Sequence, residues 1–165
     1  MADADNTGGS LTARELVDQL RSAYEAFQEL AGEKEKSKTG LAGFFGKLFQ
    51  SAGSEPEPHC AEFLSKVQSL VEMLDAALKG ADAAERDALV SEAADIMLQA
   101  KPIENKSPAQ WYMVAAEYDF SALIPHLSRE ALKAVRDDYL SSYPKRMMYP
   151  RQRELLKRME QGLSK

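Results

Sequence analysis

The chain has 165 residues, of which 44% are hydrophobic, 28% charged and 8% aromatic, and its formal net charge is −5. This length and composition are typical of one globular domain with appendages, and they exclude wholesale disorder, collagen and a disulfide-stabilised miniprotein. The single cysteine, Cys60, cannot form an internal disulfide and does not indicate an oxidising compartment. The sequence has no apolar run near the roughly 20 residues of a membrane-spanning helix and no secretion signal at its acidic start. We therefore expect a cytoplasmic protein.

The N-terminal part of the chain predicts a leader and one helix. Residues 1–10 are rich in small and acidic residues and are expected to form a flexible leader. A helix is expected over residues 11–31, because Thr12 and Glu15 have the spacing of a capping box. Apolar residues then recur every three or four positions, and the helix is expected to stop before Gly32.

Residues 32–58 are expected to be two polar linkers around a short apolar helix at 41–49. Gly40, Gly43 and Gly46 lie at three-residue intervals at and within this helix and make it weak on its own, whereas its large apolar side chains are costly to leave in water. It is therefore expected to fold only when docked on the protein's own bundle, in a partner's groove or on a membrane surface. The membrane surface is the least favoured of the three, because the flanking glutamates would oppose it. The predicted partner-binding anchors are Phe44, Phe45, Leu48 and Phe49.

Residues 59–165 predict a helical bundle. Capping signals at Asp82, Ser107 and Ser128 open three of its helices, and a last helix follows Pro150. The aromatic residues after Ser107 are expected to be mainly core, with Trp111, Val114, Ala115 and Tyr118 on one buried face. The most regular apolar stripe consists of Phe63, Leu64, Val67, Leu70, Val71, Leu74 and Leu78. The whole chain is predicted to be all-α, an irregular bundle of about six helices.

The C-terminal segment, residues 140–165, is basic. It carries a net charge of +5, so the rest of the chain carries −10. Such a segment either folds back on the acidic body or attracts an acidic partner, and interleaved aromatic residues such as Tyr143 and Tyr149 would suit nucleic acid. The predicted basic patch consists of Lys145, Arg146, Arg151, Arg153, Lys157 and Arg158.

The sequence contains no arrangement typical of a catalytic, metal or cofactor site. His59 lies one helical turn before Glu62, and His126 four residues before Glu130, but no Glu-x-x-His unit or paired zinc-ligand motif is present. The sequence also lacks nucleophile-elbow, phosphate-loop and dinucleotide motifs. We therefore expect no catalytic residue, no metal and no cofactor.

These observations favour a non-enzymatic interaction or regulatory module, an adaptor or an inhibitor, that binds a macromolecule through its apolar anchor and its basic segment. The expected partner is a protein. The alternative is a nucleic-acid-binding accessory protein that uses the basic segment. A small enzyme is a third hypothesis, and it requires a pocket near Trp111 or His126.

Overall fold

The computed structural model describes residues 9–38, 58–99 and 108–165, and every regular element within these ranges is helical. This confirms the predicted all-α class and the helical bundle. The six α-helices of the described residues are α1 (Ala13–Lys38), α3 (Pro58–Leu78), α4 (Ala83–Leu98), α5 (Pro108–Asp119), α6 (Arg129–Ser142) and α7 (Pro150–Ser164). Short 3₁₀ turns, η1 (Phe120–Ala122), η2 (Ile124–His126) and η3 (Lys145–Met147), join the later helices. Among these described helices, none combines the length and apolar character needed to cross a membrane.

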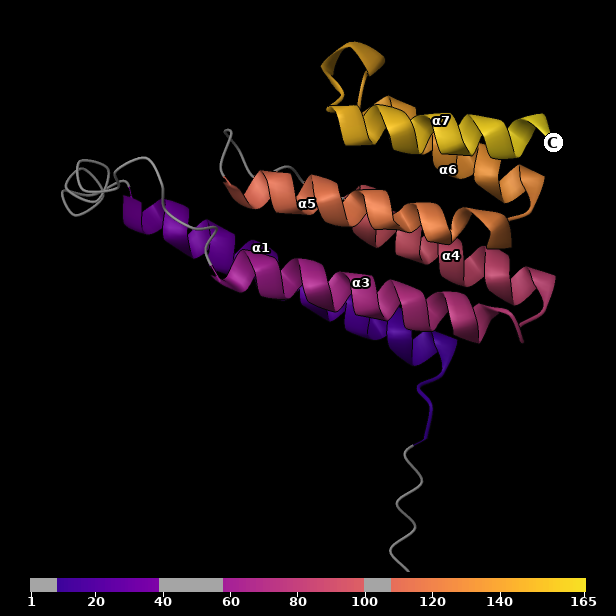
Figure 1. Cartoon of the computed structure of the whole chain (residues 1–165), viewed down its shortest axis with the longest axis horizontal. Helices are drawn as coiled ribbons and strands as arrows, with labels where there is room; N and C mark the ends of the chain where they lie inside the picture. The colour runs from indigo at the N-terminus through magenta and orange to yellow at the C-terminus, as the bar shows by residue number, and fades with distance from the viewer. Residues whose placement is uncertain (1–8, 39–57, 100–107) are drawn as a thin grey trace, which may run out of the picture.

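The helices pack as three stacked pairs (Figure 1). The first pair is α1 with α3, the second is α4 with α5, and the third is α6 with α7. Since α4 and α5 are covered by a pair on each side, they bury side chains over more than one face. The outer helices α6 and α7 instead bury one stripe each, as amphipathic surface helices do.

Local capping residues determine where the helices begin. The Thr12 hydroxyl accepts a hydrogen bond from the Glu15 backbone N–H at 3.2 Å, and the Glu15 carboxylate accepts one from the Thr12 backbone N–H at 2.8 Å. Asp82 and Ser128 cap α4 and α6 through their side-chain oxygens in the same way. These three starts agree with the sequence prediction, whereas Ser107 lies outside the described residues.

The end predicted for the first helix is wrong. The helix was expected to stop before Gly32, but the backbone of α1 continues to Lys38. A single glycine costs only about 1 kcal/mol in a helix, and the following residues are mostly glutamate and lysine, which are good helix formers. The polar composition that suggested a linker therefore also suits a solvent-exposed helix.

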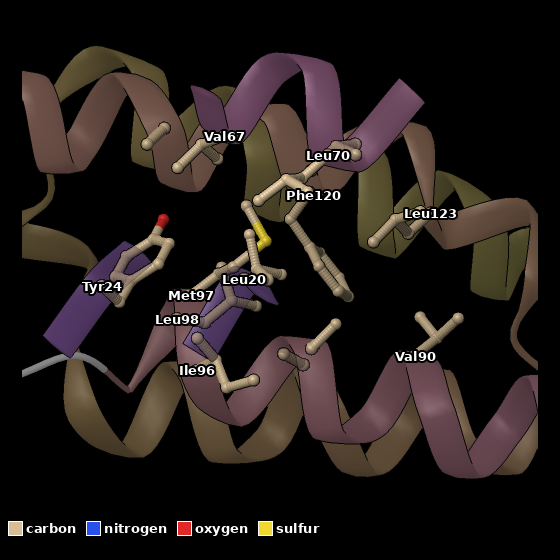
Figure 2. Close-up of a cluster of buried hydrophobic side chains, with 14 of the residues drawn as sticks. Leu20, Tyr24, Val67, Leu70, Val90, Ile96, Met97, Leu98, Phe120 and Leu123 are labelled. Carbon is tan, nitrogen blue, oxygen red and sulfur yellow. The ribbon is translucent and has the colours of Figure 1, made fainter. Parts of the chain in front are cut away.

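The core runs continuously through the bundle, and Figure 2 shows part of it around Met97 and Phe120. The predicted stripe of α3 is buried apart from Leu64, which is half-buried. The face predicted for α5 is wrong at Trp111, whose side chain is 59% exposed. The buried stripe of α5 instead includes Met113, Ala116 and Phe120, because the helix is rotated away from its largest aromatic residue.

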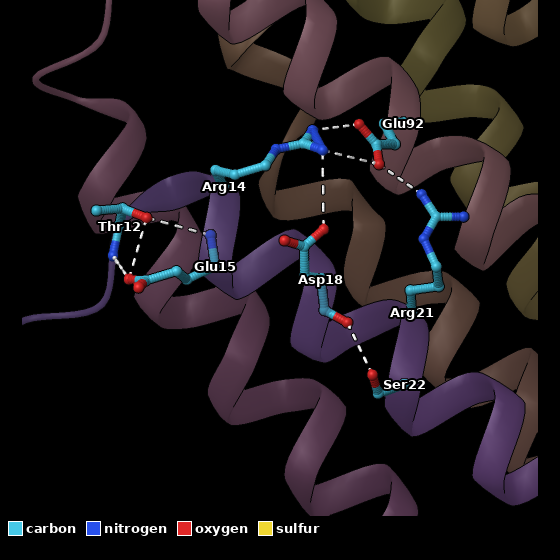
Figure 3. A network of polar contacts seen from close by, with 7 residues as sticks. All are labelled: Thr12, Arg14, Glu15, Asp18, Arg21, Ser22 and Glu92. Atoms are coloured by element: carbon cyan, nitrogen blue, oxygen red, sulfur yellow. Dashed lines mark hydrogen bonds and ion pairs between the residues drawn. The ribbon is translucent and has the colours of Figure 1, made fainter.

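A small polar network fixes α1 against α4 (Figure 3). The Glu92 carboxylate of α4 pairs with two guanidinium groups of α1, those of Arg14 and Arg21. Arg14 also lies 3.7 Å from Asp18, one turn further along α1. These side chains are partly exposed, so we expect the network to orient the two helices more than to stabilise them.

Candidate functional site

A cavity of about 290 Å³ lies at the end of the bundle where α4 and α6 finish and where α5 and α7 begin. This volume is near the lower end of the range for small-molecule sites. Met147, one of its lining residues, is 72% exposed, so the cavity reaches the surface there. The lining residues are Met97, Gln110, Met113, Val114, Glu117, Ser142, Tyr143, Pro144, Met147, Tyr149 and Gln152.

The wall of this cavity is mostly apolar. Three of its residues, Met97, Met113 and Met147, are methionines, whose flexible thioether side chains adapt to ligands of different shape. The rings of Tyr143 and Tyr149 add aromatic surface. The cavity therefore suits a ligand with an apolar body, and its specificity must come from the few polar groups.

Glu117 is the main polar group of this cavity, and we call the cavity the Glu117 pocket. The residue is only 5% exposed. Gln152 of α7, itself buried, donates from its amide nitrogen to the two Glu117 carboxylate oxygens at 3.3 and 3.4 Å. The Gln152 side-chain carbonyl accepts a hydrogen bond from the Tyr149 backbone N–H at 3.0 Å. Because that bond fixes the orientation of the amide, its NH₂ group faces Glu117.

Burial raises the pKa of Glu117 to about 7, although polar contacts from Tyr139 and Gln152 oppose the shift. The Tyr139 hydroxyl faces the carboxylate without completing a well-aligned hydrogen bond within the described residues. Burial and the Glu117 charge raise the pKa of Tyr139, and burial followed by the same charge raises that of Tyr143 to about 12. Burial likewise raises the pKa of Tyr24, with a further contribution from Glu117.

The groups around Glu117 are therefore phenols and an amide. Among the described residues, no lysine, arginine or histidine pairs with its carboxylate. The three tyrosines near it stay neutral at physiological pH, since each pKa is raised. Near neutral pH, Glu117 can therefore exchange a proton with a ligand or bind a ligand that brings a positive charge.

A surface of aromatic and basic side chains lies beside the pocket, along the seam between α5 and α7. Trp111 contacts Tyr149 with ring centroids 5.3 Å apart, and Tyr149 also lines the pocket. Seven residues after Trp111, the Tyr118 ring has two guanidinium groups over it, at 5.8 and 5.1 Å from its centroid. We call this surface the α5–α7 face and define it by Trp111, Tyr118, Met147, Tyr149, Arg151 and Arg158.

Four of the six residues of the predicted basic patch lie on α7, and the helix turns them toward two different sides. Arg151 and Arg158 lie on the side of α7 that meets Tyr118. Arg153 and Lys157 turn away from that side, because successive residues of a helix are rotated by about 100°. All four side chains are exposed.

The remaining basic residues lie in η3 before α7. Lys145 is within 3.3 Å of Glu160, and Arg146 is exposed. Together with Arg158, which lies 3.8 Å from Glu154, this shows that part of the basic charge is already paired within the segment.

The other residues singled out in the sequence are the four apolar anchors and the two histidines. The four predicted anchors, Phe44, Phe45, Leu48 and Phe49, lie outside the described residues, and their role stays a prediction. His126 lies 2.7 Å from Asp75 of α3 and not against Glu130, and His59 contacts the neighbouring Cys60 sulfur. Among the described side chains, no group of three metal-ligating residues lies together.

Sequence reasoning missed Glu117 and Gln152, although both left a recognisable signal. Glu117 lies four residues after Met113 and three before Phe120, which places it on the apolar stripe of α5. Gln152 similarly lies three residues before Leu155 and seven before Met159 on α7. A polar residue on an otherwise apolar stripe is a candidate buried polar site.

With this geometry described, comparison with known proteins adds no relative. No family profile, no curated protein and no solved structure matches the chain. The chemistry of the described residues is therefore what indicates a function.

Proposed function

We propose that this protein is a non-enzymatic interaction module that acts in the cytoplasm and binds a segment of a partner protein on its α5–α7 face. The exposed Trp111, held against Tyr149, carries the proposal. Large aromatic side chains are costly to leave in water and are enriched at the centres of protein interfaces. Met147, also exposed, lines the pocket wall together with Tyr149, and Arg151 and Arg158 lie over Tyr118 on the same helix seam.

The chemistry of this face specifies the partner. A large apolar side chain of the partner would pack on Trp111 and Met147, and acidic side chains beside it would pair with Arg151 and Arg158. The proposed occupant is thus an acidic polypeptide segment with an apolar anchor. Such an acidic segment would be attracted to the basic residues 140–165. The rest of the chain carries −10 and would repel the segment, which favours binding at the basic part.

The proposal also keeps the second apolar element, residues 41–49, as an anchor in the same interaction. Its composition supports this role, because its aromatic side chains gain several kcal/mol only when buried, at roughly 1.5–3 kcal/mol each. The Phe44→Ser/Phe45→Ser variant separates the two elements. If both contribute, this variant and a variant of the α5–α7 face each weaken binding of the same partner.

The test uses the full chain as bait and Trp111→Ala as the main variant. Met73→Ala is the matched control, because Met73 is also an exposed large apolar residue, at 44%, but belongs to α3. A partner protein retained by the wild type and the Met73 variant should be lost by Trp111→Ala. In a direct titration of that partner, Trp111→Ala should raise Kd by about 30-fold or more, the range of an interface hot spot. Equal binding by wild type and Trp111→Ala would contradict the proposal.

A second candidate function is nucleic-acid binding, and the arrangement around Tyr118 favours it. Two guanidinium groups and an aromatic ring lie together there, with Trp111 further along the same seam. Stacking on exposed aromatic rings beside cationic groups is how single strands are held. Against it, Arg153 and Lys157 point elsewhere, and the net charge of −5 opposes approach of a polyanion.

Salt dependence separates the two functions, since phosphate binding weakens steeply as ionic strength rises. For a nucleic-acid binder, a phosphate column should retain the wild type at low salt. A variant with Ser at 151, 153, 157 and 158 should then flow through. Wild-type protein that already flows through at low salt would remove this second candidate.

A further inference from the structure

The Glu117 pocket has the composition of a ligand site. It shares Met147 and Tyr149 with the α5–α7 face, but its central residue, Glu117, is buried and does not belong to that face. It combines a buried carboxylate with an apolar, methionine-rich wall. A buried carboxylate is costly in its charged form unless an opposite charge compensates it. Since no basic side chain among the described residues supplies that charge, a ligand that brings a cation would remove the cost.

We propose that the Glu117 pocket binds a small organic amine, with its ammonium group at the Glu117 carboxylate and its apolar body against the methionine side chains. The ammonium would donate to the carboxylate oxygens, which Gln152 holds only by long hydrogen bonds of 3.3 and 3.4 Å. The rings of Tyr143 and Tyr149 in the wall offer further surface for a cation.

The size of the cavity limits the ligand. At about 290 Å³, it accepts a compact apolar group with one charged end and not a large cofactor. The polar groups also exclude other classes. An anion would meet the Glu117 charge, whereas a neutral ligand of the same shape would leave that charge uncompensated.

The groups that face Glu117 make binding dependent on pH. They are Tyr24 of α1, Tyr139 of α6 and Tyr143 beyond it, all neutral near pH 7, together with the uncharged Gln152 of α7. Glu117, with a pKa of about 7, is thus the group that titrates within this set. Asp119, further along α5, has a pKa of about 6 because of burial, which the Arg151 charge partly offsets.

Only ionised Glu117 should bind an ammonium group strongly, and an alkyl amine stays protonated well above neutral pH. Affinity should therefore rise with pH. With a pKa of about 7 for Glu117, the amine should bind about tenfold more weakly at about pH 6 than at about pH 8. Binding at about pH 6 should also release nearly one proton for each amine bound.

The test uses phenethylamine with two matched probes, 2-phenylethanol and 3-phenylpropionate. Trp111 is the only tryptophan of the chain and contacts Tyr149 at the pocket wall, so its fluorescence reports binding. The amine should bind at least about tenfold more tightly than the alcohol, as expected for a hydrogen bond to a charged group. The carboxylate probe should bind most weakly.

Two variants locate the effect. Glu117→Gln should remove both the preference for the amine over the alcohol and the pH dependence. Asp95→Asn should retain both, because Asp95 lies in a different groove of α4, although burial raises its pKa as well. Calorimetry of the wild type in two buffers of different ionisation enthalpy measures the released proton without relying on any variant.

Three results would overturn the proposal. They are failure of the amine to bind at about pH 8, equal affinity for amine and alcohol, and a preference that survives Glu117→Gln. Each of these results tests the carboxylate of Glu117, which is not part of the α5–α7 face, whereas the proposed protein interaction is tested through Trp111→Ala.

Discussion

At the scale of single residues, Glu117 is a buried carboxyl whose environment raises its pKa into the physiological range. It lies on the apolar stripe of α5, 5% exposed, against a glutamine and three tyrosines. An alanine or a methionine would fill this position at less cost, because a buried carboxyl must either lose its charge or find a cation. The cost of keeping the glutamate is therefore measurable as a dependence of stability on pH.

We predict that Glu117→Gln stabilises the protein at alkaline pH and has much less effect at acidic pH. The pKa of Glu117 is about 7 in the folded protein against an ordinary value of 4.5, so the folded state binds the proton more tightly. Its contribution is favourable below about pH 4.5 and is lost as the pH rises through about 7. Between about pH 5 and about pH 8, the stabilisation by Glu117→Gln should grow by about 2–3 kcal/mol.

Urea unfolding of wild type and variant across this range measures the difference. Glu130→Gln is the matched control, because Glu130 is an exposed glutamate in the first turn of α6. Its effect should change little with pH. A constant difference between wild type and Glu117→Gln across the range would show that Glu117 is solvated in the folded protein.

At the scale of elements, the helix starts could be predicted from sequence because their causes are local. A capping side chain and its backbone partner are three residues apart, as at Thr12, Asp82 and Ser128, and no tertiary contact is needed to recognise them. The end of α1 was missed because a polar sequence suits both a linker and an exposed helix.

The faces of the central helices could be predicted less well. An outer helix has one apolar stripe, which its sequence displays, whereas α4 and α5 are covered on two sides. In α5 the large rings suggested a buried face at Trp111, but the packed side is formed largely by smaller residues such as Ala116. The Glu117 pocket could not be predicted either. It depends on how the ends of four helices meet, which is a tertiary arrangement that no local sequence pattern shows.

For α3, the stripe read from the sequence gives a direct test of the core. Leu74 is 1% exposed at the middle of that stripe, and its neighbour Met73 is 44% exposed. Leu74→Ala should lower the free energy of unfolding by roughly 2–5 kcal/mol, because it leaves a cavity in a packed interior. Met73→Ala should change it by less than about 1 kcal/mol. Chemical denaturation of both variants measures this difference, and similar losses would mean that α3 packs through another face.

At the scale of the whole molecule, the chain separates its charge along the sequence. Residues 140–165 carry +5 and the remainder −10. Within the described residues, Lys145 and Arg158 pair with glutamates of the same segment, Glu160 and Glu154. Because these pairs lie within the segment, they leave its net charge of +5 unchanged and do not neutralise the acidic body. Arg151 and Arg158 are exposed, and we expect them to attract an acidic partner to the proposed α5–α7 face.

The last prediction concerns residues 41–49 and their relation to the bundle. The described helices already share one continuous core, so we expect deletion of residues 41–49 to leave the melting temperature nearly unchanged while it weakens partner binding. In the free protein, these residues should exchange their amide hydrogens fastest among the helical elements, and a partner should protect them. Two of these nine residues, Gly43 and Gly46, are glycines, and they weaken an isolated helix. A deletion variant that unfolds, or that newly binds a dye for apolar surface, would show that residues 41–49 pack on the protein's own bundle.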